Sequence, residues 1–165
     1  MVINGPESVV ISGLRTAVES VITILETQGI KTKPLTVSHA FHSEVMDAML
    51  ADFERVANQV TYSPPQIALI SNLTGKLATA DIATPQYWLT HLRQPVRFAD
   101  SITTLHQFGY EVFLEIGPKP TLLAMGSQCL AEGVGTWLPN LRQGQSDGQI
   151  ILQSLGELYV RGQCH

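Results

Sequence analysis

Cysteine and charge are both scarce in this sequence of 165 residues. The two cysteines, Cys129 and Cys164, lie far apart and form no CxxC spacing, which argues against a zinc site or a dithiol redox centre. Charged residues make up only 15% of the chain, the formal charge is −4, and no run of Lys or Arg occurs. Because nucleic-acid binding needs clustered positive charge, nucleic acid is excluded as an expected partner.

Long hydrophobic runs are also missing. Runs such as Val9 to Ile11 are far shorter than the roughly 20 apolar residues that span a bilayer. The opening stretch, Met1 to Pro6, has neither the basic region nor the long apolar region of a secretory signal peptide. We therefore expect no membrane association and a cytoplasmic location.

The apolar residues that are present suffice for one folded domain. Hydrophobic residues make up 44% of the chain, and its length suits a single domain of about 100–200 residues. Ser8 to Ser12 is β-branched and strand-like, and from Leu14 the apolar residues recur at helical spacing up to Gly29. With residues 31–37 extended again, the pattern predicts a helix that packs on a sheet, and an α/β fold.

Further elements alternate along the rest of the chain. Ser43 suits the N-cap of a helix that runs toward Val60 and stops before Ser63-Pro64-Pro65. Residues 81–84 are expected to form a loop, and Pro85 suits the first position of a helix. The remaining predicted segments are strands over 67–71, 111–116 and 136–138, and helices over 85–93, 98–108, 121–130 and 150–160.

The stretch "HAFHS", residues 39–43, is a candidate functional site with three interpretations. Its two histidines are compatible with ordinary side chains at the end of an extended segment. They are also compatible with a metal site, although no acidic or cysteine cluster stands nearby to complete a ligand set. The third interpretation is a general base, since imidazole titrates near neutral pH. His42 precedes the expected N-cap, where the helix dipole favours the neutral ring that a base requires.

Four sequence blocks resemble one family, in that family's order. "LTVSHAFHSEVM" (35–46) resembles the acyltransferase domains of modular type I polyketide synthases and the related malonyl-CoA:acyl-carrier-protein transacylases. "NGPESVVISG" (4–13), "YWLTHLRQPVRFADSI" (87–102) and "FLEIGPKPTLLAMG" (113–126) are similar to further blocks of the family. "WLPNLRQG" and "LQSLGELYVRG" (152–162) resemble the segment that leads out of the domain.

The resemblance implies a fold with two subdomains. Residues 1–37 would belong to a ferredoxin-like small subdomain, of which they form part. Residues 38–130 would be the C-terminal part of an α/β-hydrolase-like large subdomain, and residues 131–165 an exit linker segment. Glu115 ends a predicted strand in this region, where we expect its carboxylate to accept hydrogen bonds from nearby backbone amides.

The resemblance also implies a chemistry. In this family a serine in a GHSxG motif attacks the thioester of malonyl-CoA, and a histidine accepts its proton in a ping-pong mechanism. The malonyl group then passes to the phosphopantetheine thiol of an acyl carrier protein. The match places the general base at His42 and the backbone carbonyl that orients it at or near His91. It assigns His39 and Phe41 to substrate binding, and "HAFH" resembles malonyl-selective domains.

One feature of the family is absent from the sequence. No GHSxG motif occurs: Gly126 to Cys129 lacks the second glycine, and Gly144 to Gly148 has Gln in place of the histidine and is expected to be a polar loop. We expect the nucleophile to precede the "NGP" block in the complete domain, so that this chain alone is inactive. We expect no cofactor or metal on the chain, and as partners malonyl-CoA, the carrier protein and neighbouring ketosynthase and linker domains. The alternative function is a non-catalytic scaffold or a docking module for the carrier protein.

Overall fold

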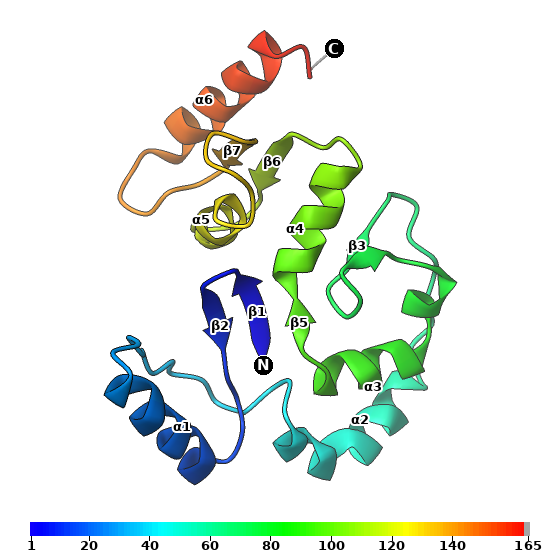
Figure 1. Cartoon of the computed structure of the whole chain (residues 1–165). Coiled ribbons are helices and arrows are strands. Elements are labelled where there is room, and N and C mark those ends of the chain that lie inside the picture. Colours follow the sequence, from blue (N-terminus) through cyan, green and yellow to red (C-terminus); the bar gives the residue numbers. More distant parts are fainter. Residues whose placement is uncertain (164–165) are drawn as a thin grey trace.

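The computed structural model describes residues 1–163, which form three small sheets joined by helices (Figure 1). The expected α/β class is confirmed. In the view of Figure 1, α1 and α2 lie at one end of the molecule and the C-terminal helix α6 lies at the other.

The first sheet joins distant parts of the sequence. Strands β1 (Val2–Gly5) and β2 (Ser8–Val10) form an antiparallel hairpin, and β5 (Val96–Arg97) pairs with β1 in parallel. The register places Val2 opposite Val96. Helix α4 (Phe98–Gln107) continues directly from β5 and packs against β1. The N-terminal hairpin is therefore attached to the segment that follows Pro95.

The expected helix after Leu14 is present as α1 (Arg15–Thr27), but it does not pack on a sheet. None of its residues is buried, and Ile24 is 56% exposed. The extended strand expected over 31–37 is wrong, because these residues form neither helix nor strand. Pro34 has no N–H for a sheet ladder, and no neighbouring strand within residues 1–163 pairs with this segment.

The helix expected from Ser43 to about Val60 is divided into two. A 3₁₀ helix, η1 (Glu44–Met49), is followed by α2 (Leu50–Ala57). Ser43 is the N-cap, as expected, and its Oγ accepts a hydrogen bond from the amide of Val45 at 3.3 Å. Met46, 3% exposed, anchors the 3₁₀ turn in the interior.

A hairpin and two helical segments connect α2 to the first sheet. Strands β3 (Ile70–Ser71) and β4 (Lys76–Leu77) pair antiparallel, so the strand expected over 67–71 is shorter than predicted. The expected loop at 81–84 is mostly a 3₁₀ turn, η2 (Ala80–Ala83). Helix α3 (Pro85–Arg93) has the predicted bounds, with Pro85 in its first turn and Thr84 as N-cap.

The C-terminal third forms a separate parallel pair. Strands β6 (Val112–Glu115) and β7 (Thr136–Pro139) are connected through α5 (Thr121–Ser127), and α6 (Asp147–Val160) follows. Helix α5 ends three residues before the predicted end at 130, and α6 starts three residues before the predicted start. Gly126 is needed for packing, since a Cβ there would lie 2.6 Å from Cζ3 of Trp137. The Trp137 ring stacks on Phe113 with centroids 4.2 Å apart.

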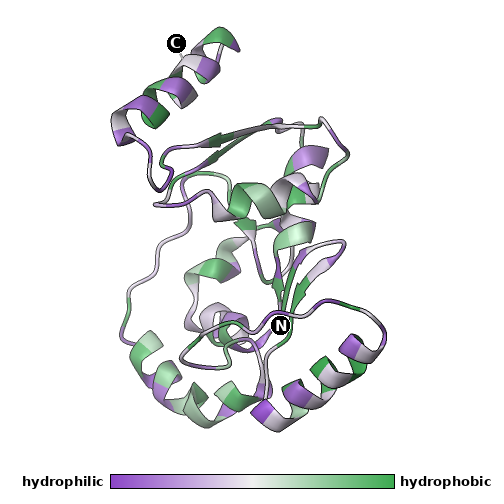
Figure 2. Ribbon diagram, turned by 90° about the vertical axis from the view of Figure 1, so that its left-hand side faces the viewer, coloured by the Kyte–Doolittle hydropathy of each residue, from purple (hydrophilic) through white to green (hydrophobic). Residues whose placement is uncertain are grey.

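The core is thin and apolar side chains remain on the outside. No large side chain in residues 1–163 is less than 2% exposed. Figure 2 shows hydrophobic positions along the outer helices as well as along the strands. No helix among the described residues has the combined length and apolarity needed to cross a membrane. The buried apolar residues are Met46, Ala57, Ile82, Tyr87, Ile102, Leu123, Leu138 and Ile150.

Candidate functional site

His42 has an unusual backbone conformation. Its φ of +58° lies in the left-handed region, and no other non-glycine residue within 1–163 has a positive φ. Histidine enters this region more readily than most residues, but the conformation needs support from its surroundings. The support comes from both sides: the amide of His42 donates to the carbonyl of Leu92 at 3.1 Å, and its carbonyl accepts from Ser12 Oγ at 3.3 Å.

The His42 ring is oriented by two backbone carbonyls. Its Nδ1 lies 3.0 Å from the oxygen of His91 and 2.9 Å from the oxygen of Gln94. A carbonyl oxygen only accepts hydrogen bonds, so we assign the proton of the neutral ring to Nδ1. The lone pair is then on Nε2. This arrangement leaves one nitrogen of a half-buried imidazole ready to take a proton.

Pro95 explains why both carbonyls are available. In a continuing helix the carbonyl of His91 would accept from the amide of residue 95, and proline has no amide N–H. Proline also disfavours the helical conformation of the residue before it, and Gln94 is extended, with ψ of 158°. The motif "HLRQP" therefore ends α3 and leaves the oxygens of His91 and Gln94 unpaired within the helix and directed at His42.

The side chain of His91 belongs to an aromatic cluster, which we define as Tyr87, Trp88, His91 and His42. The His91 ring meets the His42 ring at 90°, with the ring centroids 5.6 Å apart. Tyr87 stacks on the His91 ring, with centroids 6.0 Å apart and an angle of 18° between the ring planes. Burial lowers the pKa of His91, and charge repulsion from a protonated His42 lowers it to a smaller extent. The His91 ring is therefore neutral near pH 7.

His39 and Phe41 lie on the irregular segment just before His42. The two rings are 5.9 Å apart, and Nδ1 of His39 is 3.0 Å from Ser38 Oγ. His39 is exposed, and Phe41 is 44% exposed. The structure thus brings His42 and His91 into contact, and leaves His39 and Phe41 at the surface next to His42.

Arg93 was missed by the sequence reasoning. Its Nε lies 2.6 Å from Asp47 and its Nη2 3.5 Å from Glu44, and the side chain is only 28% exposed. This clamp ties the end of α3 to η1, which follows directly after His42 and Ser43. The spacing from Glu44 to Asp47 places both acids on one side of a helical turn, but nothing in the sequence pairs that turn with α3.

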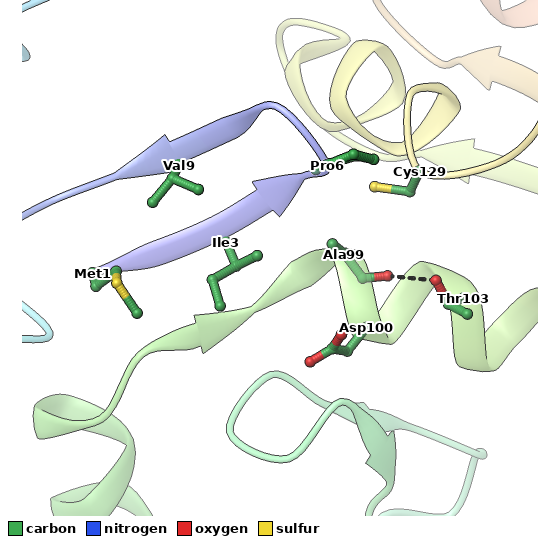
Figure 3. Close-up of a pocket in the computed structure, with 9 residues that line it drawn as sticks. Met1, Ile3, Pro6, Val9, Ala99, Asp100, Thr103 and Cys129 are labelled. Atoms are coloured by element: carbon green, nitrogen blue, oxygen red, sulfur yellow. Dashed lines mark hydrogen bonds between the residues drawn. The ribbon is translucent and has the colours of Figure 1, made fainter. Parts of the chain in front are cut away.

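Two hollows occur whose linings do not include His42. One of about 470 Å³ lies between the start of α1 and η1 and is lined by Ser43 and Arg93 among others. The other, of about 420 Å³, lies between β1 and α4 (Figure 3). Cys129 lines this second hollow, where its thiol donates to the carbonyls of Asn4 and Met125 and burial raises its pKa. A thiol held in this way is a poor nucleophile.

Glu115 behaves as expected from the sequence. Its carboxylate accepts from the amides of Thr121, Leu122 and Leu123 at 2.9–3.1 Å, which caps the start of α5. The turn before α5 is fixed further by Asn140, whose Oδ1 accepts from the amide of Gly117 at 2.8 Å. Within residues 1–163 no group of three or more His, Cys, Asp or Glu side chains gathers as a metal site would.

Comparison with known proteins identifies relatives in sequence and in structure. The chain is 43% identical over 163 residues to the polyketide synthase GfsA of Streptomyces halstedii, covering 97% of this chain and 2% of that protein. It matches the acyltransferase domain from the second module of the salinomycin polyketide synthase with a TM-score of 0.91 and 43% identity, over 98% of this chain and 38% of that one. The malonyl CoA-acyl carrier protein transacylase of Clostridium perfringens shares the fold, with a TM-score of 0.76 and 21% identity over 90% of this chain and 46% of that one.

The chain thus spans less than half of each of these proteins. Residues 1–163 match the family model described as the acyl transferase domain, which covers nearly the whole chain. Together with the relatives in polyketide synthases, this match shows that the chain belongs to the acyl transferase domain family.

Proposed function

We propose that this chain is part of an acyltransferase that moves malonyl from malonyl-CoA to the phosphopantetheine thiol of an acyl carrier protein in polyketide biosynthesis. The observation that carries the proposal is the orientation of His42. Its Nδ1 is bonded to the carbonyls of His91 and Gln94, and its Nε2 is free to act as general base. His91 serves through its backbone carbonyl as the group that orients the base.

The proposed reaction proceeds in two half-reactions. His42 Nε2 takes the proton of a serine hydroxyl while the serine oxygen attacks the malonyl thioester carbonyl. The intermediate collapses, the C–S bond breaks, and the CoA thiolate leaves with the proton returned by His42. In the second half the carrier thiol loses its proton to His42 and attacks the acyl-serine ester. The C–O bond to serine breaks, and the serine oxygen takes the proton back from His42. The two carbonyls at Nδ1 stabilise the imidazolium in both halves.

The serine comes from residues outside this sequence. Residues 1–165 contain no GHSxG motif, and the GQSDG stretch at 144–148 lies in an exposed loop and at the exposed start of α6. A base that acts as a unit with its nucleophile supports no transfer alone. We therefore propose that this chain by itself is inactive and that a complete domain contains both groups. The chain needs no bound cofactor for this role, because phosphopantetheine arrives on the carrier protein.

His39 and Phe41 are proposed to select the extender unit. They precede the base by three residues and one residue, and their rings form a pair at 5.9 Å on the same segment. A phenyl ring beside the malonyl group would exclude an α-methyl substituent. Discrimination by one methyl-sized group is worth only about 1–3 kcal/mol, so the preference for malonyl is one of degree.

The proposed division of the chain follows the family. Residues 1–37 would be part of a ferredoxin-like small subdomain, 38–130 the C-terminal part of an α/β-hydrolase-like large subdomain, and 131–165 an exit linker. The parallel pairing of β1 with β5 links the first two segments through one sheet. The partners proposed are the carrier protein and neighbouring ketosynthase and linker domains, in the cytoplasm, and nucleic acid and membranes are not among them.

The first test is to read the coding sequence upstream of Met1. An in-frame GHSxG motif within about the preceding hundred residues, the interval expected from the family resemblance, would support the proposal.

The second test is a labelling assay, in which the complete domain should be labelled by radioactive malonyl-CoA. His42→Ala should reduce transfer by about 10³-fold, within the range of general-base catalysis, whereas His106→Ala, at an exposed position of α4, should not. Full labelling of the His42→Ala domain would overturn the assignment.

A non-catalytic module is the second candidate, favoured by the missing GHSxG motif in residues 1–165. It predicts a ribosome-binding site and start codon at Met1, and binding of a carrier protein without transfer. Calorimetry with the carrier protein, together with the labelling assay, separates the two functions.

A further inference from the structure

His91 contacts the candidate base in two different ways. Its backbone oxygen accepts from Nδ1 of His42 at 3.0 Å, and its side-chain ring packs at 90° against the His42 ring. The hydrogen bonds fix the position of Nδ1, but they leave the ring free to tilt about that atom. The packed ring restricts the tilt, and the tilt decides where Nε2 points.

The His91 ring is itself held firmly. Trp88 packs against it at 5.9 Å and 66°, and Tyr87 stacks on it at 6.0 Å and 18°. Tyr87 is 6% exposed, and its hydroxyl is 2.6 Å from Ser71 Oγ in a buried hydrogen bond. A line of contacts therefore runs from the β3–β4 hairpin through α3 to the base.

We propose that the imidazole side chain of His91 is a positioning residue, which sets the plane of the His42 ring and so aims Nε2. The inference rests on the proposed role of His42 as general base. It assigns to His91 a second role through its ring, in addition to the role of its carbonyl. His91 acts only through His42 and does not touch the reacting atoms.

The charges around His91 suit a ring that stays neutral. The titratable rings packed against it are His42 and Tyr87, and the cation on the same helix, Arg93, is paired with Asp47 and Glu44. Burial lowers the pKa of His91, and a proton on His42 lowers it further. When His42 takes the serine proton, His91 therefore remains uncharged beside the imidazolium, which avoids repulsion between two cationic rings.

Two variants of the complete acyltransferase domain that includes this chain test the role of the ring. His91→Phe retains an aromatic ring without nitrogens, and His91→Gln removes the ring at similar length; both retain the backbone carbonyl. We expect the Phe variant to keep kcat within about threefold. In the Gln variant kcat should fall by about 10-fold to 100-fold at nearly constant KM, because a misplaced catalytic group costs up to about 10²-fold. His106→Gln is the matched surface control.

Nitrogen NMR of the labelled imidazole of His42 gives a readout that does not depend on activity. We expect the Nδ1–H tautomer in all three proteins, because both carbonyls remain. The Nε2 signal should be sharp in the wild type and in His91→Phe, and broadened by tilting of the ring in His91→Gln. Equal spectra and equal kcat for the Phe and Gln variants would overturn the positioning role. If His42→Ala retained transfer while the spectra changed as expected, the proposed base would fail and the positioning of its ring would stand.

Discussion

The region around His42 is held by many contacts within the chain, whereas the region around α1 is largely exposed. At His42, backbone groups, rings and a charged clamp from η1 and α3 converge within a few residues. Helix α1 and residues 31–37 also carry apolar side chains, but none of these residues is buried, and Leu14 and Val37 are each 67% exposed. The site is therefore specified by interactions inside this chain, whereas the apolar face of α1 is not covered by residues 1–163.

Truncation of a buried ring should separate the two regions most clearly. Tyr87→Ala should lower the free energy of unfolding by about 3–5 kcal/mol, since it empties a buried aromatic position and breaks the bond to Ser71. Ile24→Ala on α1 should change it by less than about 0.5 kcal/mol, as expected for an exposed side chain. Urea unfolding of both variants measures the difference. Similar losses would mean that α1 is packed as firmly as the site.

Replacement of Pro95 should weaken the site with little effect on the fold. Pro95→Ala restores an amide N–H that can compete for the carbonyl of His91, and it removes the restriction on Gln94. We expect transfer by the complete domain to fall by about 10-fold, as a displaced base would require. Pro85→Ala, at the start of the same helix, is the control and should leave transfer unchanged. Equal transfer by the two variants would show that His42 does not depend on Pro95.

The Arg93 clamp should contribute modestly and in a salt-dependent way. Arg93→Ala should cost about 0.5–1 kcal/mol of unfolding free energy at low salt, because its side chain is partly buried between two acids. Arg55→Ala, in an exposed pair with Asp52, should cost close to nothing. Thermal melts at low and high salt test both variants. A loss at Arg93 that did not shrink in salt would point to packing of its aliphatic stem instead of charge.

The smallest expected effect concerns pH. The pKa of His91 is lowered in the folded chain, so the unfolded chain binds more protons between that value and about 6.5. Stability should therefore be fully present above about pH 6.5 and decline as the pH falls through the folded pKa. Melting temperatures between pH 5 and 8 should show a shallower decline for His91→Gln than for the wild type. An identical decline would assign the pH dependence to other groups.

Much of the site follows from local sequence rules. The helix bounds over 85–93, the N-cap at Ser43 and the acidic cap at Glu115 are local, because each depends on residues within one or two turns. The spacing of four residues between His91 and Pro95 is also local, and it predicts that the carbonyl of His91 has no partner within the helix. The roles of His42, His91, His39 and Phe41 in transfer stay predictions, as do the subdomain boundaries.

Other features depend on contacts that no short window contains. The positive φ of His42 requires Leu92 and Ser12, which are distant in sequence. The Arg93 clamp and the Tyr87–Ser71 bond likewise join separate segments. The strand predicted over 31–37 is wrong for a related reason. A sequence that favours an extended backbone forms a strand only where a neighbouring strand supplies hydrogen bonds.

The cap at the start of α5 has a consequence for anion binding. The loop after a parallel strand and the following helix start are where many proteins hold phosphate groups with free amides. Here the carboxylate of Glu115 already occupies the amides of Thr121, Leu122 and Leu123. The helix carries its own counter-anion, and a phosphate approaching this end would meet a negative charge. A phosphate group is therefore not expected to bind at this end of the β6–β7 sheet.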